Sequence, residues 1–285
     1  MKGRNQQRHQ KKILQKAYVV LLGILTVTVM ACSSSEPDAP TGESELPETP
    51  TEPETDPQVP EISDEELLDL TQQETFKYFW DYAEANSGAA RERFHPNEPS
   101  NDPNTVSIGG TGFGLMALLI GVERGFITRS ESVERIEQIL NFLESADRFH
   151  GAWPHWLDGA NGTVRPFSEM DNGGDLVETA FLAQGLICIK EYFKNGNDAE
   201  KSLADKADAL WKGVEWNWYT QEKNSLYWHW RPNYGFDINL ELKGYNEVMI
   251  TYVMAAASPD FSIEKEVYTN GWASNGSITD ATSAY

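Results

Sequence analysis

A run of acidic residues at the start of a predicted helix is the strongest candidate for chemistry in this sequence. The string MDNGGDLVET at 170–179 places three carboxylates, Asp171, Asp175 and Glu178, where that helix begins. Carboxylates that line a pocket suit acid–base chemistry. A local interpretation is equally open, because Asp175 is a good N-cap residue and Glu178, three residues on, completes a capping-box-like pair. Capping leaves Asp171 unexplained, and the glycines beside it would let a ligand approach the backbone.

A second acidic helix start follows in the sequence Gly-Tyr-Asn-Glu at 244–247. Locally, Asn246 would cap the helix and Glu247 would complement the helix dipole. Parallel helices would instead bring both acidic starts to one rim. Two carboxyl groups across a cleft are what glycosidic bond cleavage requires, one protonated to assist the leaving oxygen and one ionised to activate water or attack. Burial and neighbouring acids would raise the pKa of such a proton donor. This hypothesis requires Glu247 to meet the 171–178 cluster at one cleft.

Aromatic residues in two predicted loops, 150–158 and 226–232, would surround that rim. Flat apolar faces with a polar edge suit sugar rings, whose hydroxyl groups also need polar partners. Tryptophans that alternate along a strand also pin a hairpin to helices, so each ring remains open to both interpretations. The candidates for substrate binding are these loop residues and the tyrosine of the second acidic helix start. They are Trp153, His155, Trp156, Tyr227, Trp228, Trp230 and Tyr245. No histidine, cysteine or aspartate spacing predicts a zinc site, and we expect no metal and no cofactor.

Hydrophobic periodicity predicts the helices that must position these residues. The predicted segments are 63–85, 114–124 after a turn rich in glycine (Gly109, Gly110, Gly112), 130–146, 175–193, 199–219, 247–257 and a possible seventh at 262–269. The second, fourth and sixth are apolar on most sides, whereas the first, third and fifth are amphipathic. This alternation predicts the inner and outer layers of an all-α fold, an (α/α)6 toroid, with short β-hairpins in its loops. Only about half to two-thirds of the twelve helices of such a toroid would be present.

The N-terminal segment predicts export and lipid anchoring. Its first sixteen residues carry six basic side chains and no acidic one, and 17–30 is almost wholly apolar. That run is about fourteen residues, shorter than the roughly eighteen that span a bilayer. Val-Met-Ala-Cys at 29–32 then resembles a lipobox, which predicts a signal peptide at 1–31 and an acylated Cys32. An ordinary cleaved signal with an incidental cysteine is the alternative. We expect a lipid anchor in a bacterial membrane, on the periplasmic or cell-surface side, as the sole membrane contact.

Composition divides the remaining chain into a tether and a domain. Residues 32–62 are rich in proline, glutamate and threonine, which predicts a disordered acidic spacer. The domain at 63–285 is long enough for one large core. Removal of the six basic residues and no acid with the signal changes the formal charge from −21 to −27, which argues against a nucleic-acid partner. Cys188 lies in an apolar run and is expected to be a core residue.

Four segments together, 151–158, 171–179, 227–230 and 244–259, resemble the glucoamylase-like domain of bacterial lipoproteins. Characterised members form glycoside hydrolase family 144, endo-β-1,2-glucanases with an (α/α)6 barrel. The resemblance implies that the acids at 171, 175 and 178 match a cluster needed for activity and that Glu247 matches the general acid. It also implies inverting hydrolysis without metal or cofactor. The family's barrel is longer, so the domain is expected to be incomplete, with the partner base beyond Tyr285.

Two functions from different classes follow from these residues. The first is hydrolysis of a β-glucan, with β-1,2-glucan as the expected oligo- or polysaccharide substrate. The second is a cell-surface lipoprotein that binds glycan and cleaves nothing, which explains the aromatic loops and the anchor equally well. A truncated and inactive fragment of the hydrolase is a further alternative. The paired acids favour the enzyme, because binding alone does not require them.

Overall fold

The structure is a computed structural model that describes residues 62–244 and 246–273. The predictions for the signal peptide, for the anchor at Cys32, for the tether and for Tyr245 lie outside these described residues. Within them, no helix is both long and apolar enough to cross a bilayer.

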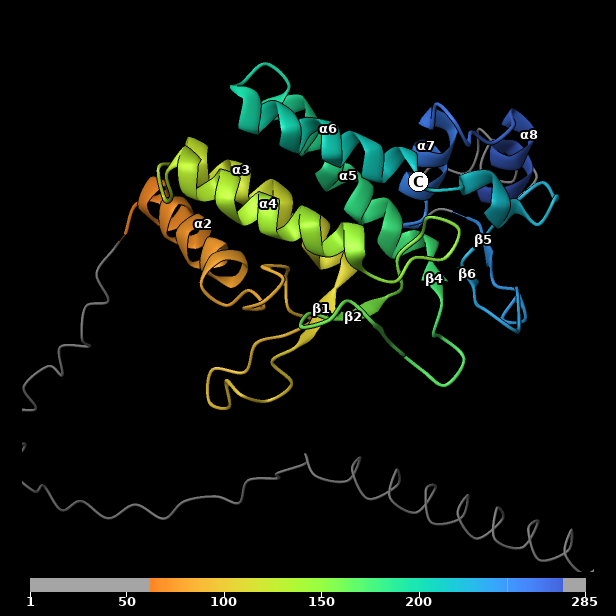
Figure 1. The fold of residues 1–285 in the computed structure, drawn as a ribbon, viewed down its shortest axis with the longest axis horizontal. Coiled ribbons are helices and arrows are strands. Elements are labelled where there is room, and N and C mark those ends of the chain that lie inside the picture. The colour runs from red at the N-terminus through yellow and green to blue at the C-terminus, as the bar shows by residue number, and fades with distance from the viewer. Residues whose placement is uncertain (1–61, 245, 274–285) are drawn as a thin grey trace, which may run out of the picture. The chain divides into compact units, whose positions relative to one another are not determined.

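Helices dominate the described part of the chain (Figure 1). They are α2 (Asp64–Trp80), α3 (Ile108–Glu123), α4 (Arg129–Ser145), α5 (Leu176–Phe193), α6 (Asp198–Lys212), α7 (Met249–Ala257) and α8 (Lys265–Val267), with a 3-10 helix η1 (Trp216–Thr220) and a π-helical turn η2 (Tyr268–Trp272). Three of the helices, α2, α4 and α6, begin with a complete capping box. The predicted helix 63–85 ends earlier, at Trp80, and the predicted helix 199–219 is divided into α6 and η1.

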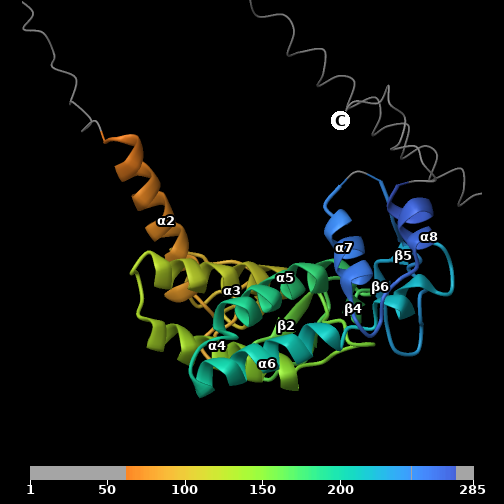
Figure 2. The same cartoon turned by 90° about the horizontal axis from the view of Figure 1, so that it is seen from above.

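The predicted alternation of apolar and amphipathic helices is confirmed by their packing. The apolar helix α5 packs against α3, α6 and α7, and the amphipathic helices α4 and α6 pack against each other. Helix α2 packs on α3. Figures 1 and 2 show the resulting helical hairpins, with α3 and α5 side by side and α4 beside α6. This is the layered arrangement expected of an α/α toroid.

The glycines before the predicted second helix lie inside that helix and not in a turn. Helix α3 begins at Ile108, with Ser107 as its N-cap, so the three glycines occupy its first turns. A Cβ atom at Gly112 would lie 2.3 Å from the backbone oxygen of Phe181, and one at Gly185 would lie 2.4 Å from that of Gly112. Because backbone atoms cannot move aside, α3 and α5 approach this closely only where both residues lack a side chain.

Short antiparallel strands tie the loops to the helix starts, as the sequence predicted. Strands β1 (Thr105–Ser107), β2 (Trp156–Asp158) and β3 (Val164–Arg165) form one sheet in that order. Two further pairs join β4 (Gly174–Asp175) to β6 (His229–Trp230) and β5 (Leu226–Tyr227) to β7 (Glu241–Leu242). The β4–β6 register sets Gly174 opposite Trp230 and Asp175 opposite His229. The second aromatic loop therefore lies directly against the start of α5.

Candidate active site

Asp175 is the N-cap of α5, and its carboxylate is fully engaged. One oxygen, Oδ1, accepts hydrogen bonds from the backbone N–H groups of Val177 and Glu178, at 2.9 and 3.0 Å. The other, Oδ2, lies 2.8 Å from Nδ1 of His155. The residue is 1% exposed. The capping interpretation is therefore confirmed for Asp175, and the same carboxylate also orients an imidazole ring.

Glu178 does not complete a capping box with Asp175. Its Oε2 instead accepts a hydrogen bond of 2.8 Å from the backbone N–H of Gly109, in the first turn of α3, and lies 3.4 Å from Oγ of Ser107. A Cβ atom at Gly109 would lie 2.6 Å from that oxygen. The glycine-rich start of α3 thus leaves the space that the Glu178 carboxyl group occupies between two helices.

The surroundings of Glu178 and His155 shift both pKa values upward. Burial raises the pKa of Glu178 and the negative charge of Asp175 raises it further, whereas His155 and the Gly109 N–H act in the opposite direction. Burial alone would lower the pKa of His155, but its hydrogen bond to Asp175 and the negative charges of the cluster raise it overall. A carboxyl group whose pKa is raised in this way is typical of an acid–base site.

The buried side chains of Asp171 and His229 lie next to each other beside this group. The Asp171 Oδ1 atom lies 3.1 Å from Nε2 of His229, and the two side chains are 1% and 0% exposed. The backbone N–H of Gly173 also donates to that nitrogen, at 3.0 Å. Among the described residues, neither carboxylate oxygen of Asp171 has a hydrogen-bond donor. Since buried polar atoms are rarely left without a partner, these oxygens are suited to accept one from a ligand or a water molecule.

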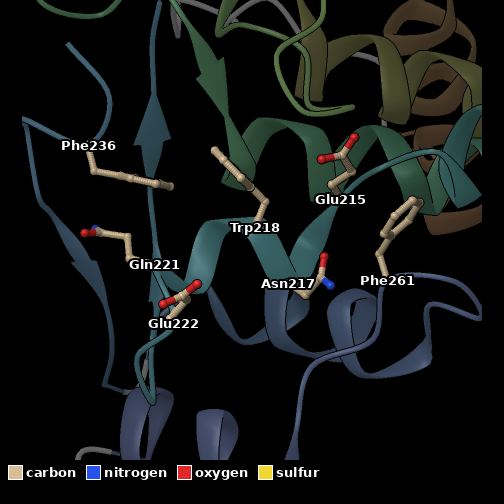
Figure 3. A pocket seen from close by; sticks show the side chains of 7 residues that line it. All are labelled: Glu215, Asn217, Trp218, Gln221, Glu222, Phe236 and Phe261. Atoms are coloured by element: carbon tan, nitrogen blue, oxygen red, sulfur yellow. The ribbon is translucent and has the colours of Figure 1, made fainter.

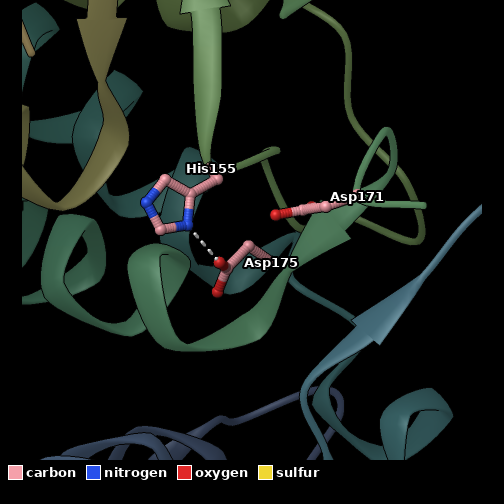
Figure 4. Close-up of side chains that lie close together, drawn as sticks. All are labelled: His155, Asp171 and Asp175. Carbon is pink, nitrogen blue, oxygen red and sulfur yellow. Dashed lines mark hydrogen bonds and ion pairs between the residues drawn. The ribbon is translucent and has the colours of Figure 1, made fainter. Parts of the chain in front are cut away.

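Figure 4 shows the His155 ring and the two aspartates close together at the start of α5. One ligand atom from each of His155, Asp171 and Asp175 lies within 4.8 Å of the others, a spacing that can hold a metal ion. The Nδ1 atom of His155, however, is already paired with Asp175. The expectation of a metal-free site therefore stays a prediction that requires a chelation experiment.

The predicted aromatic residues divide into core and accessible groups. Trp153 is fully buried, and its indole N–H donates to the backbone oxygen of Leu143 at 3.0 Å, so its expected role as a sugar platform is wrong. Tyr227 is also buried, at 6% exposure. Accessible surface remains on the other four candidates that the structure describes, His155, Trp156, Trp228 and Trp230. Trp156 packs edge-on against Phe167, with ring centroids 4.9 Å apart.

Glu247 lies in an exposed turn and not inside a helix. Helix α7 begins two residues later, and the side chain of Asn246 accepts a hydrogen bond from the Val248 N–H at 3.2 Å. Glu247 is not among the hydrogen-bond partners of Asp171, Asp175 or Glu178 within the described residues. The structure thus brings the three acids at 171–178 together but does not join Glu247 to them, and the role expected for Glu247 stays a prediction.

Sequence reasoning missed an aromatic site beside Trp230. Trp218, in η1, stacks on the His150 ring and contacts Trp230, yet the periodicity placed it in the last turn of a predicted helix. The run Trp-Asn-Trp-Tyr at 216–219, which directly follows a glycine-containing segment, was the available signal. Figure 3 shows Trp218 among the side chains that line a cavity of about 540 Å³.

Layered helical hairpins with a buried carboxyl cluster at the start of a central helix are features of a fold that resembles the α/α toroids of solved β-1,2-glucanases. Comparison with known proteins gives the particular relatives. A family model described as "Putative glucoamylase" matches residues 239–285. An exo β-1,2-glucooligosaccharide sophorohydrolase (non-reducing end) of Parabacteroides distasonis is 51% identical over 216 residues, which cover 75% of this chain and 29% of the relative.

Two solved structures extend this comparison. An endo-β-1,2-glucanase from Chitinophaga pinensis, in complex with sophorotriose and glucose, is 55% identical with a TM-score of 0.76, over 79% of this chain and 54% of that one. A β-1,2-glucanase from Parabacteroides distasonis is 48% identical with a TM-score of 0.71, over 75% of this chain and 30% of that one. The chain thus spans 29–54% of the length of these three relatives. The resemblance found in the sequence is confirmed, since these homologues are named for β-1,2-glucan cleavage.

Proposed function

We propose that the protein hydrolyses the glycosidic bonds of β-1,2-glucan. The observation that carries this proposal is the cluster at the start of α5, in which a half-buried Glu178 with a raised pKa lies beside the buried carboxylates of Asp175 and Asp171. Relatives about half identical to this chain are named for cleavage of the same linkage, which supports the choice of substrate.

The proposed reaction is an inverting displacement. A protonated carboxyl group donates its proton to the departing glycosidic oxygen while water adds to the anomeric carbon from the opposite face and loses a proton to a base. Positive charge develops on the sugar ring in the transition state. The carboxylates at 171–178 stabilise that charge because they are fixed before the reaction and shielded from water. By resemblance we propose Glu247 as the proton donor, which requires substrate to approach its exposed turn.

Hydrolysis is distinguished from binding by a test for product. The protein is incubated with β-1,2-glucan, β-1,3-glucan and starch, and new reducing ends are measured. Reducing ends from β-1,2-glucan alone are expected. Retention of β-1,2-glucan without any product, under conditions where the protein is folded, would refute the hydrolase and favour either a glycan-binding lipoprotein or an inactive fragment.

We also propose that the protein is a lipoprotein anchored through Cys32. The support is the basic and apolar segment before the Val-Met-Ala-Cys sequence. Metabolic labelling with an alkyne fatty acid in a bacterial host is expected to label the protein and to lose the label in Cys32→Ala. The matched control is Cys188→Ala, since Cys188 lies in α5 and burial raises the pKa of its thiol. Equal labelling of both variants would refute the anchor.

A further inference from the structure

A cavity that the catalytic proposal does not use lies beside η1 (Figure 3). Its volume is about 540 Å³, and three aromatic rings line it, those of Trp218, Phe236 and Phe261. The carboxylates of Glu215 and Glu222 and the amides of Asn217 and Gln221 form its polar lining. A space of this size holds a small ligand with both apolar and polar faces.

Trp218 is held as a rigid platform at this cavity. One face of its indole is covered by the His150 imidazole, with ring centroids 3.8 Å apart and an interplanar angle of 13°. The imidazole is itself fixed, because its Nδ1 lies 3.0 Å from Oε2 of Glu215 and its ring meets Trp230 edge-on. Trp218 nevertheless remains 43% exposed. The face that His150 does not cover is therefore available to a ligand.

The backbone around the cavity adopts conformations that non-glycine residues rarely take. His150, Gln221 and Glu222 have positive φ angles of 49°, 53° and 58°. Left-handed conformations cost free energy in residues with a Cβ, and they are concentrated where surrounding contacts hold side chains for a function. Here they place a ring under Trp218 and two hydrogen-bonding side chains at the cavity wall.

The lining chemistry disfavours an anion and suits a hydroxyl-rich ligand. Among the residues that the structure describes, no lysine or arginine lines the cavity, so an anion would find no positively charged partner there. Carboxylate and amide groups instead accept hydrogen bonds from hydroxyl groups, while the aromatic faces stack on the C–H faces of a sugar ring. We propose that this cavity is an accessory subsite that binds a glucosyl unit of a β-glucan chain, with Trp218 as its platform.

One residue, Trp230, connects the Trp218 platform to the strand that leads into the acid cluster. Trp230 contacts Trp218, with ring centroids 6.3 Å apart, and pairs in the β4–β6 ladder with Gly174, the neighbour of Asp175. In this proposal a glucan chain whose one end occupies the cavity extends past Trp230 toward the carboxylates at 171–178. The linkage of the ligand rests on the proposed function, whereas the sugar class rests on the cavity itself.

The test compares Trp218→Ala with Tyr82→Ala, in which an exposed aromatic residue remote from the cavity is removed. Binding of β-1,2-glucan is measured by calorimetry in the Glu178→Gln background, in which hydrolysis of the ligand is slowed. Loss of the platform is expected to raise Kd about tenfold, and to raise KM similarly for long chains in the otherwise unaltered protein. Trp218→Phe, which keeps an aromatic face, should recover part of the binding.

The outcomes separate the subsite from the proposed function. Hydrolysis of β-1,2-glucan with Kd and KM equal in Trp218→Ala and Tyr82→Ala would overturn the subsite and leave the enzyme standing. Absence of β-1,2-glucan hydrolysis, together with Trp218-dependent binding of another glucan, would refute the proposed substrate but support a sugar site. Trp218-dependent binding of a cationic ligand, and of no glucan, would also overturn the subsite.

Discussion

Replacement of Glu178 by glutamine removes one charge from the proposed site with almost no change in shape. The amide oxygen can still accept the hydrogen bond that Glu178 receives from the Gly109 N–H at 2.8 Å. The charge removed lies beside Asp175, which caps the same helix. Any large effect on hydrolysis would therefore report the loss of the carboxylate and not the loss of a structural contact.

The expected loss follows from the role of a fixed charge in the transition state. Removal of one preorganised group that stabilises developing charge lowers kcat by about 100- to 1,000-fold. This corresponds to about 2.7–4 kcal/mol of transition-state stabilisation. The role proposed for Glu178 requires its carboxylate in the ionised form. Activity should thus fall as the pH falls through the pKa of Glu178. Because that pKa is raised, the fall should occur at a higher pH than the pKa of an ordinary glutamate side chain.

The contribution of Glu178 to the free energy of unfolding should change with pH in the direction opposite to the change in activity. Because the pKa of Glu178 is higher in the folded protein than in the unfolded chain, the stability that this group contributes is present at low pH and is lost as the pH rises through the folded-state pKa. Glutamine does not titrate. The variant should therefore gain stability relative to the parent between pH 4 and neutral pH, as measured by urea unfolding.

Initial rates of reducing-end release across pH provide the assay, with Glu134→Gln as the control because Glu134 is an exposed residue on α4. The control should match the parent. A kcat for Glu178→Gln within about threefold of the parent value would refute the assignment, since even general acid–base roles contribute about 100-fold. If the activity of Glu178→Gln falls at low pH as that of the parent does, a group other than Glu178 causes this fall.

Three further predictions address the surroundings of this carboxyl group. Asp175→Asn keeps an N-cap residue but removes a negative charge, so the pKa values of both Glu178 and His155 should fall. NMR titration measures both values, and an unchanged His155 pKa would contradict the pairing of His155 with Asp175. Gly112→Ala places a Cβ 2.3 Å from a backbone oxygen and should lower the free energy of unfolding by about 1–3 kcal/mol in urea denaturation. A variant as stable as the parent would show that α3 and α5 can separate. EDTA should leave hydrolysis unchanged, whereas a loss restored by a divalent cation would assign a metal to His155, Asp171 and Asp175.

Local features of the site were predictable from the sequence. The start of α5 and its N-cap at Asp175 follow from periodicity and capping chemistry, which involve residues within one turn. The partner of Glu178 was not predictable in this way, because Gly109 lies 69 positions earlier in the chain. For the same reason the sequence pattern suggests a turn at Gly109, Gly110 and Gly112, whereas Gly109 and Gly112 lie where α3 approaches α5 closely.

Residue type alone did not distinguish core tryptophans from accessible ones. Trp153 and Trp218 both follow an amphipathic helix, yet one is fully buried and the other is 43% exposed. Their difference arises from tertiary contacts, since the indole N–H of Trp153 reaches Leu143 in α4 while Trp218 turns onto His150. The exposure of Glu247 is likewise set by where α7 begins, at Met249 and not at 247.

The capping of α5 and the raised pKa of Glu178 are consequences of one arrangement. A helix N-terminus by itself favours an ionised carboxyl group and lowers its pKa. At α5, however, the carboxylate of Asp175 takes the N–H groups of Val177 and Glu178, so the side chain of Glu178 turns toward α3, where Gly109 donates to it. Glu178 is left partly buried beside the negative charge of its own N-cap, and its pKa rises. The capping and catalytic interpretations of the acidic string are therefore compatible, because the cap is the charge that perturbs its neighbour.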